Sequence, residues 1–395
     1  MRKQNTFVLL LLLMITPCLT IAQKKELDQA RSIIKSGKDF NKAEQLMTDL
    51  LKDAKNKDNK KIYITWFDAV RACFTAANER FYLKQTQDTA EFFDLNRRMF
   101  AVLEKLDSVE MHPNKKGRVD IEYRSKHAEI LNTYRPNLFN AGTYFMRKGD
   151  YQKAFDYFEI YIDCDRQPIF TGRNYQETDK RMPEAAYWAT FSGYKLNDAL
   201  RTLRYRELAL RDSSKASFTL QYIAEARQWL KDREFYVQTL EEGFSRFPTF
   251  SYFFPRLLDA YTQDGNLDKA LETTNIAIAA CDTCDIYYFA KATTLLRMGH
   301  YEECINVSEH IIEVNNQYAE AYFNIGTCYI NLALQFDENK DKKLLRQFYQ
   351  KARPYMERYR KLEPEAKEKW GPALYRIYLN LNMGKQFDEI DRLLK

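Results

Sequence analysis

Glycine and proline are scarce in this chain, which has 12 Gly and 10 Pro among 395 residues. Both residues interrupt helices, so a chain that contains few of them favours long helices joined by short turns. A phosphate-binding loop also needs clustered glycines for close backbone approach, and the sequence has no Walker-type or Rossmann-type glycine run. The composition therefore argues against the common nucleotide-binding folds.

Motifs for catalysis are missing as well. The four His are dispersed, without the His-Glu-x-x-His pair of a metalloprotease, and the Gly-x-Ser-x-Gly turn of a hydrolase does not occur. A zinc site needs four ligands, and a second Cys-x-x-Cys to complete one is absent. We therefore expect no enzyme activity, no cofactor and no metal site.

The charge balance is nearly even, with 61 Lys and Arg against 55 Asp and Glu. The excess of +6 falls to +4 when Arg2 and Lys3 are left out (59 − 55), and both lie in the segment that we predict to be removed. So small an excess, spread along the chain, predicts neither a nucleic-acid partner nor an anionic membrane surface.

The first residues have the layout of a secretory signal peptide. Basic residues precede an apolar run over 7–15, and a small-residue site ends at Ala22. We predict a signal peptide over residues 1–22, cleaved after Ala22, and an exported protein that is periplasmic or associated with the cell envelope. The run is too short for a membrane anchor, and no later segment approaches 18 apolar residues, so we expect no transmembrane segment. Cys18 leaves open a lipoprotein alternative, which Pro17 immediately before it fits poorly.

What the chain has in abundance is aromatic residues, 27 Tyr and 26 Phe, often three or four positions apart as on one face of a helix. Two segments, Gly265–Ala270 and Gly299–Cys304, occupy the same place in successive helical hairpins, 34 residues apart (299 − 265). Pro248, Asp282 and Asn316 mark hairpin ends at the same interval. An internal repeat of helix pairs follows from this spacing.

The period resembles that of the tetratricopeptide repeat, a helix pair of about 34 residues. The clearest copy runs from Arg135 to about Arg166, and further copies lie at 217–248, 251–282 and 285–316, with the start of another near 319. The residues of the clearest copy that stand at family positions are Leu138, Ala141, Gly142, Phe145, Gly149, Tyr151, Ala154 and Phe158. The resemblance implies an all-α fold, a right-handed α-solenoid of stacked antiparallel helix pairs in which small residues let the two helices approach closely.

Departures from the pattern predict the organisation of the chain. We expect divergent helical pairs over residues 23–134 and a tetratricopeptide array over 135–395. Breakers near 167–183 and an extra polar stretch near 331–347 predict two insertions into that array.

In the resembled family, positions 2, 5, 9, 12 and 13 of the first helix line a concave groove. The candidate groove residues that this implies are Phe139, Trp188, Glu225, Asp259, Phe289, Thr293, Phe323 and Thr327. The Lys and Asn set with which chaperone-binding members clamp a peptide carboxylate is missing. Two interpretations of the aromatic residues remain open: they pack against neighbouring helices, or they line a groove for an apolar segment.

The most specific chemical motif is Cys281-Asp282-Thr283-Cys284, which lies between two hairpins. A thioredoxin-like pair needs a strand-to-helix junction, so a local disulfide or two loop thiols is the better interpretation of Cys281 and Cys284. The other cysteines of the exported chain lie in apolar helical patterns, as small buried side chains do.

Together these features predict a non-catalytic scaffold or adaptor in the bacterial cell envelope, binding a protein or peptide partner through the groove. The alternative is a carbohydrate-binding accessory protein of outer-membrane nutrient uptake. Some proteins of that class carry tetratricopeptide-like helices.

Overall fold

A computed structural model describes residues 23–83, 88–114, 116–337 and 340–395. The predicted signal peptide, residues 1–22, lies outside the described residues. The described residues form helices and turns without any β-strand. They divide after Leu230 into two compact units, each of which is described by itself below.

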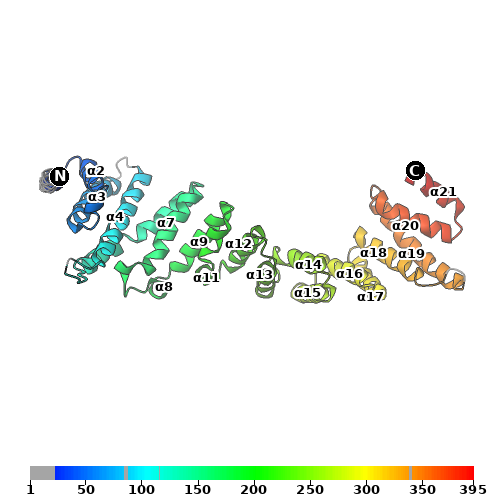
Figure 1. Cartoon of the computed structure of the whole chain (residues 1–395). Helices are drawn as coiled ribbons and strands as arrows, with labels where there is room; N and C mark the ends of the chain where they lie inside the picture. The colour runs from blue at the N-terminus through cyan, green and yellow to red at the C-terminus, as the bar shows by residue number, and fades with distance from the viewer. Residues whose placement is uncertain (1–22, 84–87, 115, 338–339) are drawn as a thin grey trace, which may run out of the picture. The chain divides into compact units, whose positions relative to one another are not determined.

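The first unit consists of helices that pack on their neighbours in sequence (Figure 1). A helix over residues 23–36 opens it. The α-helices that follow are α2 (Phe40–Leu50), α3 (Lys60–Tyr82), α4 (Thr89–Glu110), α5 (Arg124–Tyr134), α6 (Pro136–Arg147), α7 (Tyr151–Asp163), α8 (Tyr175–Thr178), α9 (Met182–Lys195), α10 (Ala199–Arg204), α11 (Arg206–Ala209) and α12 (Ala216–Trp229). Short 3-10 turns occur at Ala54–Asn56, Cys164–Arg166 and Pro168–Phe170. One continuous hydrophobic core extends from Tyr63 on α3 to Tyr222 on α12.

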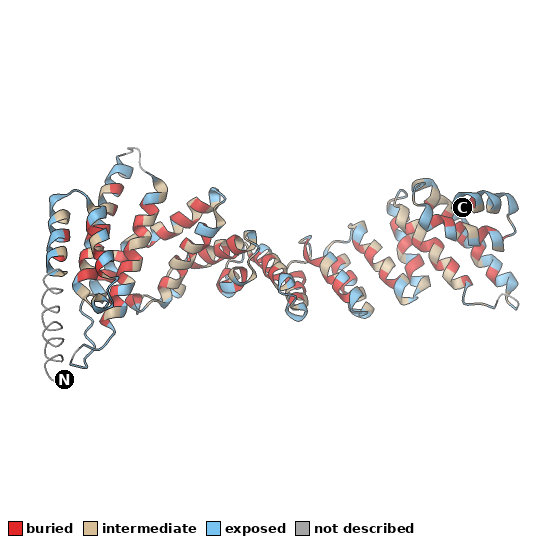
Figure 2. Ribbon diagram, turned by 45° about the horizontal axis from the view of Figure 1, so that its top comes forward, coloured by how far each residue is buried: buried red, intermediate tan, exposed pale blue. Residues whose placement is uncertain are grey.

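The second unit repeats the same construction with longer regular stretches. Its helices are α13 (Arg233–Arg246), α14 (Phe253–Gln263), α15 (Leu267–Ala280), α16 (Asp285–Met298), α17 (Tyr301–Val314), α18 (Ala319–Ala333), α19 (Lys342–Leu362), α20 (Lys367–Asn380) and α21 (Gly384–Leu394). Each packs on the next, and short connections make consecutive helices antiparallel. Within each unit the buried residues lie on the faces where helices meet (Figure 2). The predicted all-α solenoid of stacked helix pairs is therefore confirmed.

A residue with left-handed backbone ends the first helix of successive pairs at a constant interval. Positive φ occurs at Asn197 (53°), Lys231 (57°), Gly265 (71°) and Gly299 (79°). Each of these follows the one before by 34 residues (231 − 197, 265 − 231 and 299 − 265). The repeat is thus regular in backbone geometry over a longer stretch than its glycines mark.

Gly149 has the same backbone (φ 76°) but precedes Asn197 by 48 residues, 14 more than the repeat (48 − 34). The segment between α7 and α9 contains the additional turns and α8. Arg135 holds this segment in place, because its guanidinium lies between the rings of Tyr161 (3.8 Å) and Tyr175 (3.9 Å). The same guanidinium pairs with Asp179 at 2.5 Å. A buried guanidinium with two cation–π contacts and an ion pair strongly stabilises the position of the segment that it contacts.

At the second expected insertion, α18 continues to Ala333 and α19 begins at Lys342. The division of the array at residue 134 stays a prediction. None of the helices in the described part of the chain is long and apolar enough to cross a membrane.

Candidate functional site

Helices α14 and α16 of the second unit are first helices of successive pairs and run in the same direction, because the antiparallel α15 lies between them in sequence. Each buries one face: Leu257 and Tyr261 on α14, and Ala292 and Leu295 on α16, are almost fully inaccessible. On the opposite face, residues four positions apart remain partly or fully exposed: Pro255 and Asp259 on α14, and Phe289 and Thr293 on α16. Each of the two helices therefore has one face that its neighbours do not cover.

A cavity of about 440 Å³ lies where these faces meet. Its floor is aromatic: Phe254 is 5% exposed and meets the ring of Tyr287 edge-on, with ring centroids 4.7 Å apart. The walls are mainly apolar, and the side chain of Ile286 at the rim is 56% exposed. The residues that line the cavity are Ser251, Phe254, Pro255, Leu258, Asp259, Thr262, Ile286, Tyr287, Phe289, Ala290, Thr293, Thr294 and Arg297. Its size and lining are those of a site that takes a small molecule or a large side chain.

Two charges of opposite sign stand on the lining. Asp259 lies on α14, and Arg297 lies in the last turn of α16; both side chains are exposed. Within the part of the chain that the structure describes, neither forms an ion pair or a side-chain hydrogen bond, with each other or with any residue. Both charges are therefore available to a bound partner.

The two threonines of α16 at the cavity differ in hydrogen bonding. Thr294 donates its hydroxyl to the carbonyl oxygen of Ala290 at 2.8 Å. The Oγ1 atom of Thr293 is buried without a hydrogen-bond partner among the described residues. A buried polar atom that lacks a partner lowers stability.

The structure brings together three of the predicted groove residues, Asp259, Phe289 and Thr293, at this cavity. It does not bring the others to it. Phe323 and Thr327 lie on α18 and do not line the cavity. Phe139, Trp188 and Glu225 belong to the first unit.

All four of the predicted groove aromatics are in contact with other rings. Phe139 meets Phe158 and Tyr161 edge-on, at centroid distances of 5.7 and 5.6 Å. Trp188 packs on Phe191 (5.8 Å) and donates its indole N–H to Glu184. These contacts account for both residues as packing groups within the first unit.

Phe323 is covered from two sides. Its ring lies 5.1 Å from that of Tyr359, and the ammonium of Lys369 lies 5.6 Å from its centroid. Phe289 also has a ring neighbour, Tyr318 at 5.6 Å, but it lines the open cavity as well. Among the predicted groove aromatics, Phe289 lines this cavity, and Phe139, Trp188 and Phe323 do not.

Sequence reasoning did not single out Ile286 and Arg297. Both stand at positions 2 and 13 counted from Asp285, which the resemblance to the tetratricopeptide repeat assigns to a groove, so the signal was present in the same register that gave Phe289 and Thr293. Pro255 stands likewise at position 5 of the preceding copy.

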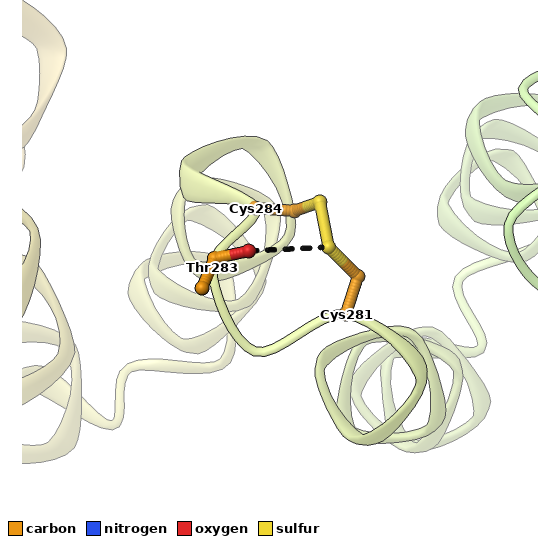
Figure 3. Close-up of a disulfide and its surroundings, with 3 residues drawn as sticks. All are labelled: Cys281, Thr283 and Cys284. Carbon is orange, nitrogen blue, oxygen red and sulfur yellow. Dashed lines mark hydrogen bonds between the residues drawn. A yellow bond between two sulfur atoms is a disulfide. The ribbon is translucent and has the colours of Figure 1, made fainter.

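A disulfide joins Cys281 and Cys284, directly before the cavity-lining stretch of α16 (Figure 3). These residues are the C-cap of α15 and the N-cap of α16. Between them, the Thr283 hydroxyl lies 3.7 Å from the Cys281 sulfur. The disulfide restricts the connection between α15 and α16, which ends two residues before Ile286 on α16.

Among the residues that the structure describes, no group of three or more His, Cys, Asp or Glu side chains is arranged to hold a metal ion. The site consists of an apolar cavity with two charges, lined by the first helices of two successive pairs.

The helix pairs and their 34-residue backbone period define an all-α repeat fold with the period of the tetratricopeptide repeat. No protein-family model matches the sequence. No curated protein matches it either.

Solved structures to which the chain is similar include several described as tetratricopeptide proteins. YrrB, described as having an unusual peptide-binding site, is 16% identical, with 48% of this chain and 90% of that chain covered and a TM-score of 0.35. The C-terminal part of a repeat-containing protein from Cytophaga hutchinsonii is 14% identical over 64% of this chain and 92% of its own, with a TM-score of 0.43. The P58(IPK) repeat domain is 11% identical over 92% and 99%, with a TM-score of 0.26. At these identities the likeness concerns the fold alone.

Proposed function

We propose that this chain is a non-catalytic interaction scaffold of the bacterial cell envelope, which binds a segment of a partner protein where α14 and α16 line the cavity. The observation that carries the proposal is the cavity itself, with the 56% exposed Ile286 at its rim and the unpaired Asp259 and Arg297 on its lining. Elsewhere the predicted groove aromatics Phe139, Trp188 and Phe323 are engaged in contacts within the protein.

The binding face is tested by crosslinking in cells that produce the protein. A benzophenone side chain at position 286 should crosslink to a defined partner, whereas the same group at position 276, on α15 and outside the cavity, should not. Ile276 is a suitable control because it is 46% exposed, close to the exposure of Ile286. The purified partner should then bind the wild type and Ile276→Glu equally and Ile286→Glu more weakly. Equal binding to all three would contradict the proposed face.

The envelope location rests on the predicted signal peptide. The chain isolated from the envelope fraction should begin at Gln23 and carry no lipid, as an intact-mass measurement will show. A mass that includes residues 1–22 would contradict export by this route, and a lipid attached at Cys18 would support the lipoprotein alternative instead.

A further inference from the structure

The cavity between α14 and α16 has an apolar part and a charged part. Because the two helices run in the same direction, residues early in each lie at one end of the cavity and residues late in each at the other. Phe254, Pro255, Ile286 and Phe289 are early, and they are all apolar. The apolar end therefore suits one large apolar side chain.

The charged part follows along the same helix faces. Asp259 comes one helical turn after Pro255, and Arg297 comes two turns after Phe289. The charges come from different helices and do not pair with each other. A bound segment therefore meets a negative charge on one wall and a positive charge on the other, within a few residues of its apolar side chain.

We propose that the cavity recognises a peptide segment in which a large apolar residue is followed or preceded, within about two helical turns, by one basic and one acidic residue. The basic residue faces Asp259, and the acidic residue faces Arg297. This inference rests on the proposed function and adds the chemistry of the partner segment. Complementary charges of this kind select among partners and fix the direction in which a segment lies.

The presence of one negative and one positive side chain, Asp259 and Arg297, argues against a membrane surface or a nucleic acid as the bound partner. An anionic membrane or a nucleic acid would require a surplus of Lys and Arg, and the lining has one positive and one negative side chain. A segment with charges of one sign would bring like charges together at Asp259 or at Arg297. A segment with both signs avoids this cost.

The probe for the test is a random library of nine-residue peptides displayed on phage. It is selected on the full chain without its leader, after removal of the phages that bind Ile286→Glu. We expect enriched sequences that contain one Phe, Trp, Leu or Ile with one Lys or Arg and one Asp or Glu nearby. Synthetic peptides of these sequences should bind about two- to fivefold more weakly to Asp259→Asn and to Arg297→Gln, as expected for exposed ion pairs. Binding to Ile276→Glu should equal that of the wild type.

A charge exchange gives the sharper measurement. The double variant Asp259→Arg/Arg297→Asp keeps the charge of the cavity and exchanges the two signs. It should select peptides in which the basic and acidic residues have exchanged places relative to the apolar residue. The substituted positions 259, 276, 286 and 297 are all exposed, so the variants should fold, and circular dichroism will verify their helicity.

The outcomes separate the two proposals. If peptides depend on Ile286 but show no charge preference, or if the exchanged variant selects the same sequences as the wild type, the charge recognition is wrong and the binding face stands. If no enriched peptide depends on Ile286, both the binding face and this inference are wrong.

Discussion

Gly142 on α6 faces the ring of Phe158 on α7 so closely that a Cβ atom at Gly142 would lie 2.7 Å from two of the ring carbons. Phe158 is fully buried. The approach of α6 to α7 therefore depends on the missing side chain. The same relationship occurs at the equivalent place in the second unit, where a Cβ at Gly326 would lie 2.6 Å from the Met356 methyl group.

Gly142→Ala should lower the free energy of unfolding by about 1 to 3 kcal/mol, because the added methyl group overpacks the core against the fully buried ring of Phe158. Urea denaturation followed by circular dichroism measures the change. Gly384→Ala is the control: a Cβ there meets nothing within 4 Å, so its effect should be neutral or slightly stabilising. Equal effects of the two substitutions would show that the contact with Phe158 does not limit the packing.

The repeat was predictable where its turn residue is glycine, at Gly265 and Gly299. It was harder to see upstream, since Asn197 and Lys231 occupy the same turn with left-handed backbone. A left-handed conformation is inexpensive for Gly, tolerable for Asn and unfavourable for Lys, so the residue type did not reveal the backbone at position 231.

Lys231→Gly should raise the free energy of unfolding by about 0.5 to 1 kcal/mol, because glycine removes the steric cost of the left-handed backbone at an exposed turn. Asn197→Gly should give a smaller change, since Asn adopts this conformation more readily. Thermal unfolding of both variants beside the wild type provides the comparison. Destabilisation by Lys231→Gly would mean that the lysine side chain contributes more than its backbone conformation costs.

The site was predictable only in part. The helical register placed Asp259, Phe289 and Thr293 on groove positions, and the structure gathers them at one cavity. The same register offered Phe139 and Phe323, whose rings contact Tyr161 and Lys369 respectively and do not line the cavity. A repeat pattern assigns a residue to a helix face. It does not predict which side chains of other helices pack against that residue, particularly where those helices depart from the repeat.

Thr293→Val should leave the free energy of unfolding unchanged or raise it by up to about 1 kcal/mol, because it replaces a buried hydroxyl without a partner by a methyl group of similar size. Thr294→Val should lower it by about 0.5 to 1.5 kcal/mol, since it removes the hydrogen bond to Ala290. The neighbouring positions share one helix, which makes helix propensity the same in both. A larger loss at Thr293 than at Thr294 would show that the Thr293 hydroxyl is satisfied in solution.

Thiol titration tests the disulfide. The chain from Gln23 onward has six cysteines, the seven of the full sequence less Cys18 (7 − 1). Isolated without reductant and titrated under denaturing conditions, it should show four thiols, from Cys73, Cys164, Cys304 and Cys328. After reduction it should show six. Six thiols before reduction would show that Cys281 and Cys284 are not joined by a disulfide in the exported protein.

The stability of the first unit should depend on pH through Glu104. Burial raises the pKa of the Glu104 carboxyl from 4.5 to about 7, and the negative charge of Asp163 adds to the rise. Between these two values the folded chain binds more protons than the unfolded chain, so this group makes the free energy of unfolding fall as pH rises from about 4.5 to about 7. Glu104→Gln removes that dependence and should be more stable than the wild type at pH 8, by on the order of 1 to 3 kcal/mol, with the difference vanishing near pH 4.

Urea denaturation of the wild type and Glu104→Gln between pH 4 and pH 8 gives the difference in the free energy of unfolding as a function of pH. Glu177→Gln serves as control because the Glu177 side chain is 79% exposed. A difference between Glu104→Gln and the wild type that stays constant with pH would show that Glu104 is hydrated in the folded protein.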